Sequence, residues 1–503
     1  GGGINGCAVA EEAAARGLRV ALFERDDFGS GTTWRSTKLI HGGLRYLEHG
    51  DLRLVFESLR ERAWLLRSRD YLVKPQRFLL PILPWTRRPK WQLGLGLELY
   101  DLLALYRGVP AHQRLSDAAL HDLAPALPAG THGGFAFYDA RALAPERLAL
   151  ELALDAQRAG AAICNHATVT GIETAAGRVT SISVEQAGQT CQFEVAAVIN
   201  AAGPWVDAVN HALDTQTPPL LGVTRGTHIV VEPGEPPRRD AVFSTAKEDG
   251  RVFFAVPQGD LLLIGTTDDR FDGEPGDVRP TREDIDYLLT EAESLLPGLQ
   301  LGRRHIRYAY AGLRPLQRVK GGPEAAISRR HTVIDHARDG GPHGLMSVVG
   351  GKLSTFRPLA REALDRLDAP ARQLPRAEAA GNDWRRQLRD SKLDAPVRQH
   401  LRQYGGGLRD VLAGSREILC PHAHAILGEI PYVCRHENVV TLSDVMLRRT
   451  GISWSACRGL CCVERVADEA SRYLGWDASE RERQLDAFRA DVDRHLPLEQ
   501  DIV

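Results

Sequence analysis

The sequence predicts a mixed α/β fold, and three observations indicate it. The chain starts with a glycine-rich turn and a small-residue helix, and further glycine turns beside strand or helix patterns occur later. Residues 227–231, 252–256 and 261–266 predict alternating strands of one antiparallel sheet. From residue 397 onward the pattern is helical with a polar outer face. Because these segments interleave, we expect one discontinuous Rossmann-like domain with an inserted sheet domain, followed by a helical domain.

The opening residues Gly1 to Gly6 read G-x-G-x-x-G. Gly1 permits a tight turn, Gly3 lets backbone N–H groups approach a pyrophosphate, and Gly6 allows close helix–strand packing. Glu24 follows about 20 residues into the motif, where a carboxylate accepts ribose hydroxyls and repels a 2′-phosphate. The spacing therefore favours FAD or NAD over NADP. The alternative is an ordinary glycine-rich βα turn.

The segments on either side of this motif lead to two further expectations. The motif normally follows a strand, so we expect a central strand of about 5–8 residues to precede Gly1. An NAD domain would usually continue with regular βα units, but here a loop of small residues covers 29–37. A helical segment then runs from Lys38 to about Arg67. The loop can wrap a longer ligand, which favours FAD.

Later segments complete the predicted Rossmann-like domain. Residues 144–159 predict a helix with Pro145 in its first turn, and 164–172 predict the strand after it. Residues 195–205 read as a buried strand that ends in a glycine turn. Residues 347–352 repeat the strand and Gly-Gly turn, and a helix continues from there to about Leu367.

Composition excludes several classes of protein. The chain has 503 residues and a net charge of −2, so its overall charge does not indicate a nucleic-acid partner. No apolar run reaches the ~18 residues of a membrane-spanning helix. Eight scattered cysteines without a visible signal peptide fit a reducing cytoplasm. The segment 420–424 and the cysteines of 457–462 invite a metal interpretation, but neither has paired C-x-x-C spacing, so no metal is expected.

Six segments carry a resemblance to a known family. They are residues 1–6, 36–48, 200–205, 264–268, 310–316 and 350–357. Together they resemble the FAD-dependent (aerobic, quinone-linked) glycerol-3-phosphate dehydrogenase family, within the D-amino-acid-oxidase-like flavoproteins. The part around His41–Tyr46 is the most specific, whereas many flavoproteins share the glycine motif. One departure is Ala-Pro-Glu-Arg-Leu at 144–148, where Asp-Ala-Arg-Leu is expected; it touches no proposed catalytic group.

The resemblance implies a division of the chain into an FAD-binding domain, an antiparallel-sheet substrate domain and a C-terminal helical cap. Its boundaries are 1–75, 139–215 and 331–368 for the FAD-binding domain, 76–138 and 216–330 for the substrate domain, 369–396 for a linker, and 397–503 for the cap. The clearest predicted helices of the cap are 439–449 and 461–474. Arg448-Arg449-Thr450 is its most recognisable piece.

The resemblance also implies the activity and its partners. It implies oxidation of sn-glycerol 3-phosphate to dihydroxyacetone phosphate, with electrons passed from FAD to a membrane quinone. It implies a cytoplasmic protein bound peripherally to the inner membrane, and it leaves open whether the chain forms a homodimer. The implied FAD contacts are Gly1, Gly3, Gly6, Glu24, Thr37, Lys38, His41, Gly42, Gly43, Val169, Ala202, Gly203, Trp205, Gly351, Lys352, Leu353 and Ser354.

The substrate site is interpreted from the chemistry of alcohol oxidation. Guanidinium groups bind phosphate oxygens in pairs, and Arg45, Arg314 and Lys352 all lie beside glycine turns or proline kinks. With Tyr46 they form the predicted phosphate site, and the alternative for each cation is a structural ion pair.

A proton acceptor is also needed. The family places a histidine facing the flavin at the start of a strand, which makes His228 the candidate, with His41 as its rival and Arg314 as the third predicted catalytic residue. Without the family, His228 reads as an ordinary hydrogen-bonding residue.

Residues 85–106 join cations and aromatic residues to an apolar stretch of helix length. This composition suits a lipid interface. A core helix after an arginine-rich turn is the alternative, and a lipid-soluble acceptor favours membrane contact.

Three other functions stay open. An oxidase using oxygen differs by forming peroxide, and an amino-acid oxidase of the same group would use Arg314 for a carboxylate. A binding module without turnover is disfavoured, because holding a cofactor does not require a second anion site.

Overall fold

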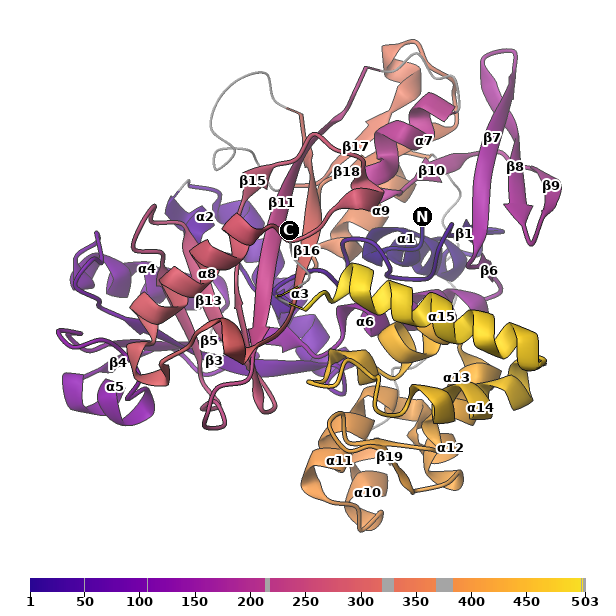
Figure 1. Cartoon of the computed structure of the whole chain (residues 1–503). Helices are drawn as coiled ribbons and strands as arrows, with labels where there is room; N and C mark the ends of the chain where they lie inside the picture. Colours follow the sequence, from indigo (N-terminus) through magenta and orange to yellow (C-terminus); the bar gives the residue numbers. More distant parts are fainter. Residues whose placement is uncertain are drawn as a thin grey trace.

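The computed structural model describes residues 1–48, 50–105, 107–212, 218–318, 330–367, 383–498 and 500. Figure 1 shows three regions: short parallel strands with helices around the N-terminus, a large sheet, and a helical C-terminal region. The side chains of Arg45 and Glu48 also lie outside the described part.

The Rossmann-like region contains two pieces of parallel sheet. In one piece β1 pairs with β6, and in the other β10 pairs with β18, which continues antiparallel to β17. Three helices pack with these strands, and α1 lies between α6 and α9. The bounds are α1 Ile4–Ala15, β1 Ala21–Phe23, α6 Pro145–Arg158, β6 Ala162–Cys164, β10 Val198–Asn200, β17 Thr332–Asp335, β18 Leu345–Val349 and α9 Phe356–Asp365. This confirms the predicted interleaving of the domain.

Helix α1 can approach its two neighbours closely because its face consists of alanines and Gly6, which are all buried. The N-terminal amine of Gly1 donates to the carbonyl oxygen of Phe23 at 2.9 Å, at the end of β1. The expectation of a strand before Gly1 concerns residues outside this sequence and stays a prediction.

The large sheet has ten strands in the order β15-β11-β14-β13-β12-β3-β5-β2, with β16 on β11 and β4 on β5. The bounds are β2 Leu39–Ile40, β3 Val73–Pro81, β4 Gln113–Leu115, β5 Gly134–Ala142, β11 Leu221–Val231, β12 Ala241–Thr245, β13 Val252–Gln258, β14 Leu261–Gly265, β15 Asp269–Arg270 and β16 Ile306–Gln317. The three strands predicted for the inserted sheet lie in β11, β13 and β14, and they are antiparallel as expected.

Opposite faces of this sheet have different partners. One face packs against helix α8 (Arg282–Leu295) through a cluster that includes Ile229, Ile285 and Leu288. The other face belongs to the main core and carries Val230, Tyr308 and Tyr310. This second face is therefore the one that the large sheet turns towards the Rossmann-like region.

Several predicted bounds shift in the structure. Strands β3 and β5 extend across the predicted boundaries at residues 76 and 138. The helix expected from Lys38 to Arg67 divides into β2, α2 (Leu44–Glu48) and α3 (Leu52–Ser68), because Gly42, Gly43 and Gly50 interrupt it. Pairing in the sheet overrides helix propensity at Leu39 and Ile40.

The second half of the region predicted as a linker, 369–396, contains helix α10 (Asp383–Asp390) and the start of α11 (Ala395–Leu401). The first half lies outside the described residues. Trp384 and Leu388 of α10 are buried in the main core, which explains why this polar segment is helical.

The remaining elements are two small sheets, β7-β8-β9 and β19-β20, and a set of helices. They are α4 Lys90–Leu103, α5 Asp117–Leu123, β7 Ala167–Ala175, β8 Arg178–Gln186, β9 Gln189–Glu194, α7 Val206–Ala212, α12 Leu408–Ala413, β19 Ile418–Cys420, β20 Ala425–Ile426, α13 Glu429–His436, α14 Val463–Leu474 and α15 Ala478–His495. A π-helical turn covers Asp444–Arg449, inside the helix predicted over 439–449.

Buried ion pairs join the C-terminal helices to the Rossmann-like region. Arg449 donates to both carboxylate oxygens of Asp27, at 2.7 and 2.8 Å, and both side chains are fully buried. Arg147 of α6 pairs with Glu437 in the same way, at 2.6 and 3.0 Å. Because a buried charge that loses its partner typically costs about 3–5 kcal/mol, these pairs fix the helical region against the rest of the molecule.

The segment proposed for membrane contact forms helix α4. Its residues Leu97 and Tyr100 are buried, so they belong to the core and do not face lipid. For these two residues the alternative interpretation, a core helix, is the correct one. Trp91, Leu95 and Leu102 are exposed by 71, 64 and 55 % on another face of the helix. No helix among the described residues is long and apolar enough to cross a membrane.

Candidate active site

The glycine motif forms a tight turn at the start of α1, beside the end of β1, where side chains have no room. A Cβ atom on Gly6 would overlap the carbonyl oxygen of Gly1, and one on Gly1 would lie 2.7 Å from the carbonyl oxygen of Ala201. At the first turn of α1 the N–H of Ile4 donates to Thr33 Oγ1 at 3.0 Å. The backbone around the helix N-terminus is thus held in the compact form that a pyrophosphate requires.

Glu24 follows β1 and closes this turn. One carboxylate oxygen accepts from the backbone N–H of Gly2, and the other accepts from the N–H of Asp26 at 2.9 Å. The side chain therefore lies at the edge of the turn, where the fingerprint places a ribose-binding carboxylate.

A cavity of about 420 Å³ opens beside this turn, between the two pieces of parallel sheet. Ten of the predicted FAD contacts line it: Gly1, Gly3, Glu24, Val169, Ala202, Gly203, Trp205, Gly351, Lys352 and Leu353. Its wall combines a glycine turn, a carboxylate and an apolar surface, which are the features that hold a dinucleotide. The residues present therefore fit FAD.

Other predicted FAD contacts lie outside this cavity. A Cβ on Gly42 would lie 2.7 Å from Leu59 and from the Tyr100 hydroxyl, and one on Gly43 would overlap the Tyr46 ring. Their backbone thus packs against α2, α3 and α4. Gly6 lies inside α1, and Ser354 is buried beside the start of α9. The contact of these residues with FAD stays a prediction.

Lys38 is buried, and its backbone has a φ of 60°. The ammonium lies 3.6 Å from the centre of the Trp454 ring and 3.8 Å from the Glu146 carboxylate. Burial lowers the pKa of Lys38 to about 8, although Glu146 acts in the opposite direction.

His228 lies on the face of β11 that points to the main core. Its Nε2 is 2.9 Å from Thr37 Oγ1, and its ring stacks on Tyr310 of β16 at 4.9 Å. The buried Nδ1 has no hydrogen-bond partner within the described part of the chain. Burial, followed by the charges of Arg314 and Lys38, lowers the pKa of His228 to about 3. The imidazole is therefore neutral at physiological pH.

Arg314 lies on the same face, opposite Thr224 in the β11–β16 ladder. Nη1 donates to the Asp268 carboxylate at 2.8 Å, and Nη2 donates to Thr266 Oγ1 and to the Thr267 carbonyl, both at 3.1 Å. A Cβ on Gly226 would lie 2.6 Å from the Arg314 Cζ. The guanidinium therefore folds back along the strand over Gly226, in the direction of His228.

Of the other predicted phosphate ligands, Lys352 and Tyr46 lie next to each other. The Lys352 ammonium lies 3.6 Å from the centre of the Tyr46 ring, so these two residues are adjacent although about 300 positions separate them. The Arg45 side chain lies outside the described residues. His41 follows β2 directly and is half-buried.

Two residues near the site were not singled out from the sequence. Tyr310 stacks on His228 and donates to the Ser36 carbonyl at 2.8 Å, which joins the sheet to the loop of small residues. Arg141 of β5 donates to the Pro257 carbonyl, its Nε has no partner among the described residues, and burial lowers its pKa to about 10. A lone arginine in the apolar strand 134–142 was the available signal.

Comparison with known proteins agrees with this geometry. Residues 1–357 match the family model of FAD dependent oxidoreductases, and residues 371–481 match the model for the C-terminal domain of alpha-glycerophosphate oxidase. The chain belongs to the FAD dependent oxidoreductase family. FAD is accordingly the cofactor of this fold. The fingerprint and Glu24 left both FAD and NAD open, and the loop over residues 29–37 favoured FAD.

Relatives within this family are similar over nearly the whole chain. The glycerol-3-phosphate dehydrogenase of Synechocystis is 35 % identical, covering 97 % of this chain and 94 % of its own. The D-erythritol 1-phosphate dehydrogenase of Brucella abortus is 34 % identical over 90 and 93 %. The crystal structure of the Bacillus halodurans glycerol-3-phosphate dehydrogenase with FAD has a TM-score of 0.77 at 27 % identity, covering 98 % of this chain and 94 % of that one.

Proposed function

We propose that this protein oxidises sn-glycerol 3-phosphate to dihydroxyacetone phosphate and passes the electrons through FAD to a membrane quinone. The family membership and the relatives at 32–35 % identity support a dehydrogenase of a polyol phosphate. The observation that carries the proposal is the placement of a neutral, buried imidazole and an oriented guanidinium on one face of the β11–β16 pair.

This face can bind both ends of a short polyol phosphate. The Arg314 guanidinium lies over Gly226, and His228 is two residues further along the strand, which corresponds to about 7 Å. A phosphate on Arg314 then directs the carbon chain and its secondary hydroxyl towards His228. Asp268 and Thr266 hold the guanidinium in this orientation through the hydrogen bonds described above.

The protein's contribution to the oxidation is positioning and proton transfer. When bound, FAD supplies the acceptor for the hydride that leaves the alcohol carbon. His228 takes the hydroxyl proton at Nδ1, since that atom has no other partner among the described residues and Nε2 is held by Thr37. Tyr310 and Thr37 keep the ring in place, so that the base does not need to reorient.

The exposed apolar face of α4 supports peripheral contact with a membrane. Trp91, Leu95 and Leu102 recur at helical spacing on one side, and Leu52 and Phe56 of α3 are exposed by 45 and 39 %. Helices α3 and α4 are neighbours. A lipid-facing surface of this kind brings the protein to the phase in which a quinone dissolves. We infer a position at the inner face of the cytoplasmic membrane.

The test is anaerobic addition of sn-glycerol 3-phosphate to the flavin-loaded protein. We expect the oxidised flavin band near ~450 nm to bleach and to recover on addition of a quinone analogue. Bleaching by D-amino acids without any effect of the phosphate ester would refute the proposal. Recovery with stoichiometric peroxide from oxygen, and none with quinone, would reassign the acceptor.

One other substrate follows from a specific relative. The Brucella enzyme is a D-erythritol 1-phosphate dehydrogenase at 34 % identity. D-Erythritol 1-phosphate shares the phosphate and a secondary alcohol, so the same experiment with both compounds, compared by kcat/KM, decides between them.

A further inference from the structure

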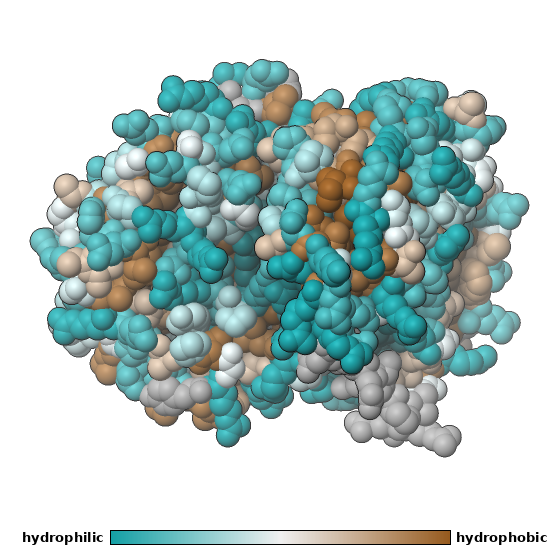
Figure 2. All heavy atoms as spheres, turned by 90° about the horizontal axis from the view of Figure 1, so that it is seen from below, coloured by the Kyte–Doolittle hydropathy of each residue, from teal (hydrophilic) through white to brown (hydrophobic). Residues whose placement is uncertain are grey.

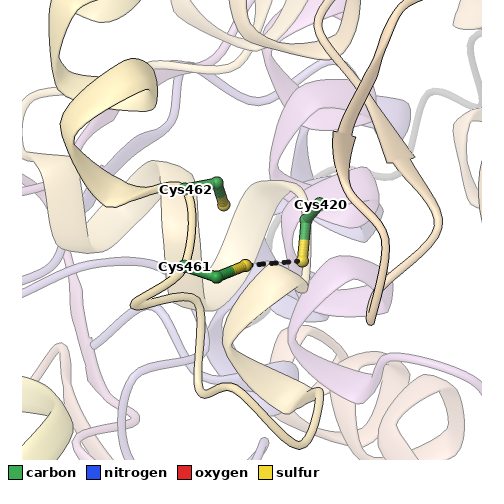
Figure 3. A group of neighbouring side chains, drawn as sticks. All are labelled: Cys420, Cys461 and Cys462. Atoms are coloured by element: carbon green, nitrogen blue, oxygen red, sulfur yellow. Dashed lines mark hydrogen bonds between the residues drawn. The ribbon is translucent and has the colours of Figure 1, made fainter.

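Three cysteine sulfurs from two separate segments, the end of β19 and the loop before α14, converge in the C-terminal region. Cys420 Sγ lies 3.7 Å from Cys457 Sγ and 3.6 Å from Cys461 Sγ, and the last two are 3.3 Å apart. Figure 3 shows Cys461 and Cys462 on one loop, with Cys420 facing them from the end of a strand. The three sulfurs thus form a nearly equilateral triangle.

Two further donors flank this triangle. The ligand atoms of Cys420, Cys461 and Cys462 all lie within 4.8 Å of one another, and so do those of His422, Cys457 and Cys461. Cys462 therefore lies beside the Cys420–Cys461 edge of the triangle, and His422 lies beside the Cys457–Cys461 edge. Cys420 is buried whereas Cys461 and His422 are exposed, so the group is open to solvent on one side.

The spacing matches the edges of a metal-centred tetrahedron. Zinc–sulfur bonds of about 2.3 Å give sulfur–sulfur edges of about 3.8 Å. A disulfide, at about 2.05 Å, would join two of the sulfurs and leave the third without a role. Plain apolar packing does not account for an exposed thiol and an exposed imidazole at the same point.

The local backbone suits such a centre. Cys420 ends β19, and the short connection to β20 carries His422 and lets the N–H of Ala423 donate to Cys420 Sγ at 3.4 Å. The second loop turns at Arg458 and Gly459, with φ of 53° and 82°, so that Cys457 and Cys461 face the same side. Hydrogen bonds from backbone amides stabilise a thiolate over a thiol.

We propose that this group binds one zinc ion through Cys420, Cys457 and Cys461, with Cys462 or His422 as the fourth ligand. On binding, each ligating thiol releases its proton and becomes a thiolate. The ion cross-links the β19–β20 hairpin to the loop that precedes α14, and thereby stabilises the C-terminal region. Sequence spacing alone does not predict a metal at this point, because the ligands do not follow C-x-x-C spacing.

The test measures metal in the purified full-length flavoprotein from zinc-supplemented cells. We expect about one zinc per chain by elemental analysis, less than a tenth of that in Cys457→Ser and Cys461→Ser, and a lower melting temperature in both. Cys191→Ser is the matched control, since this exposed cysteine on β9 lies outside the group, and it should keep its zinc. Of Cys462→Ser and His422→Ala, the variant that removes the fourth ligand loses zinc and the other keeps it.

A second measurement uses the wild-type protein, so that its result does not depend on whether the variants fold. After chelation of the wild-type protein, added Co²⁺ should produce the intense visible absorption of tetrahedral thiolate coordination, and zinc should displace it. The proposal is overturned by wild-type protein that contains no zinc and shows no such band, by a disulfide among these cysteines, or by stoichiometric iron in place of zinc.

Discussion

A methyl group at Gly226 should weaken the substrate site without removing any polar atom. The added Cβ would lie 2.6 Å from Arg314 Cζ and 2.7 Å from Nη1, whereas ordinary contacts are about 3.5 Å, so the guanidinium must move by about 1 Å. The move pulls it from Asp268 and out of line with a bound phosphate. A misplacement of this size can cost about 10²-fold in rate, and a lost charge-assisted hydrogen bond about 1.5–3 kcal/mol. We therefore expect Gly226→Ala to lower kcat/KM by about 10–100-fold.

The matched control is Gly222→Ala. Gly222 lies on the same strand and the same face, but its Cβ would meet only ordinary contacts at 3.5 Å or more. Both substitutions remove the same backbone freedom from the unfolded chain. The assay is stopped-flow flavin reduction against substrate concentration, with FAD content and melting temperature recorded for both variants. If Gly226→Ala reduced its flavin as the control does, Arg314 would not bind the substrate, and the placement of the phosphate would be wrong.

Three other predictions test the base, the membrane face and a buried charge. His228→Gln should slow flavin reduction at saturating substrate by about 10²–10⁴-fold with little change in Kd, since glutamine cannot take the proton; an equal loss of binding would argue against this role. Charged residues at both Trp91 and Leu95 should lower vesicle binding at least tenfold, because a buried leucine alone contributes about 1.5–3 kcal/mol, and activity with a soluble dye should persist. Burial, then Arg35, lowers the pKa of His495 from 6.5 to about 2, so only the unfolded chain binds this proton between those values. Stability should therefore fall with pH below 6.5 by up to ~1.4 kcal/mol per unit, and His495→Gln should flatten the Tm profile.

The glycine motif and the antiparallel strands could be predicted because their signals are local. The G-x-G-x-x-G spacing and Glu24 describe one turn, and the short apolar runs of β13 and β14 describe two neighbouring strands. Leu97 and Tyr100 show the limit of this reasoning. Their segment has the composition of a lipid interface, but only packing against α3 and β5 decides which face of α4 is buried.

The contacts that join distant segments could not be predicted from spacing. Thr37 meets His228 across 191 positions, and Lys352 meets Tyr46 across about 300. The cysteines of 457–462 are close to Cys420 because β19 ends opposite their loop, and no periodicity records that proximity. Such pairs depend on how whole elements pack.

The low pKa of His228 in the free protein bears on how the base works. Two of its causes are the cations Arg314 and Lys38, which disfavour a second positive charge nearby. A phosphate dianion on Arg314 offsets that charge, and a nearby anion raises the pKa of a histidine. If Arg314 binds the phosphate as proposed, substrate binding makes His228 a stronger base at the moment when the hydroxyl arrives, while burial keeps it neutral before that. Because the imidazole and the guanidinium share one face of β11 and β16, the contact proposed to hold the phosphate would also prepare the proposed proton acceptor.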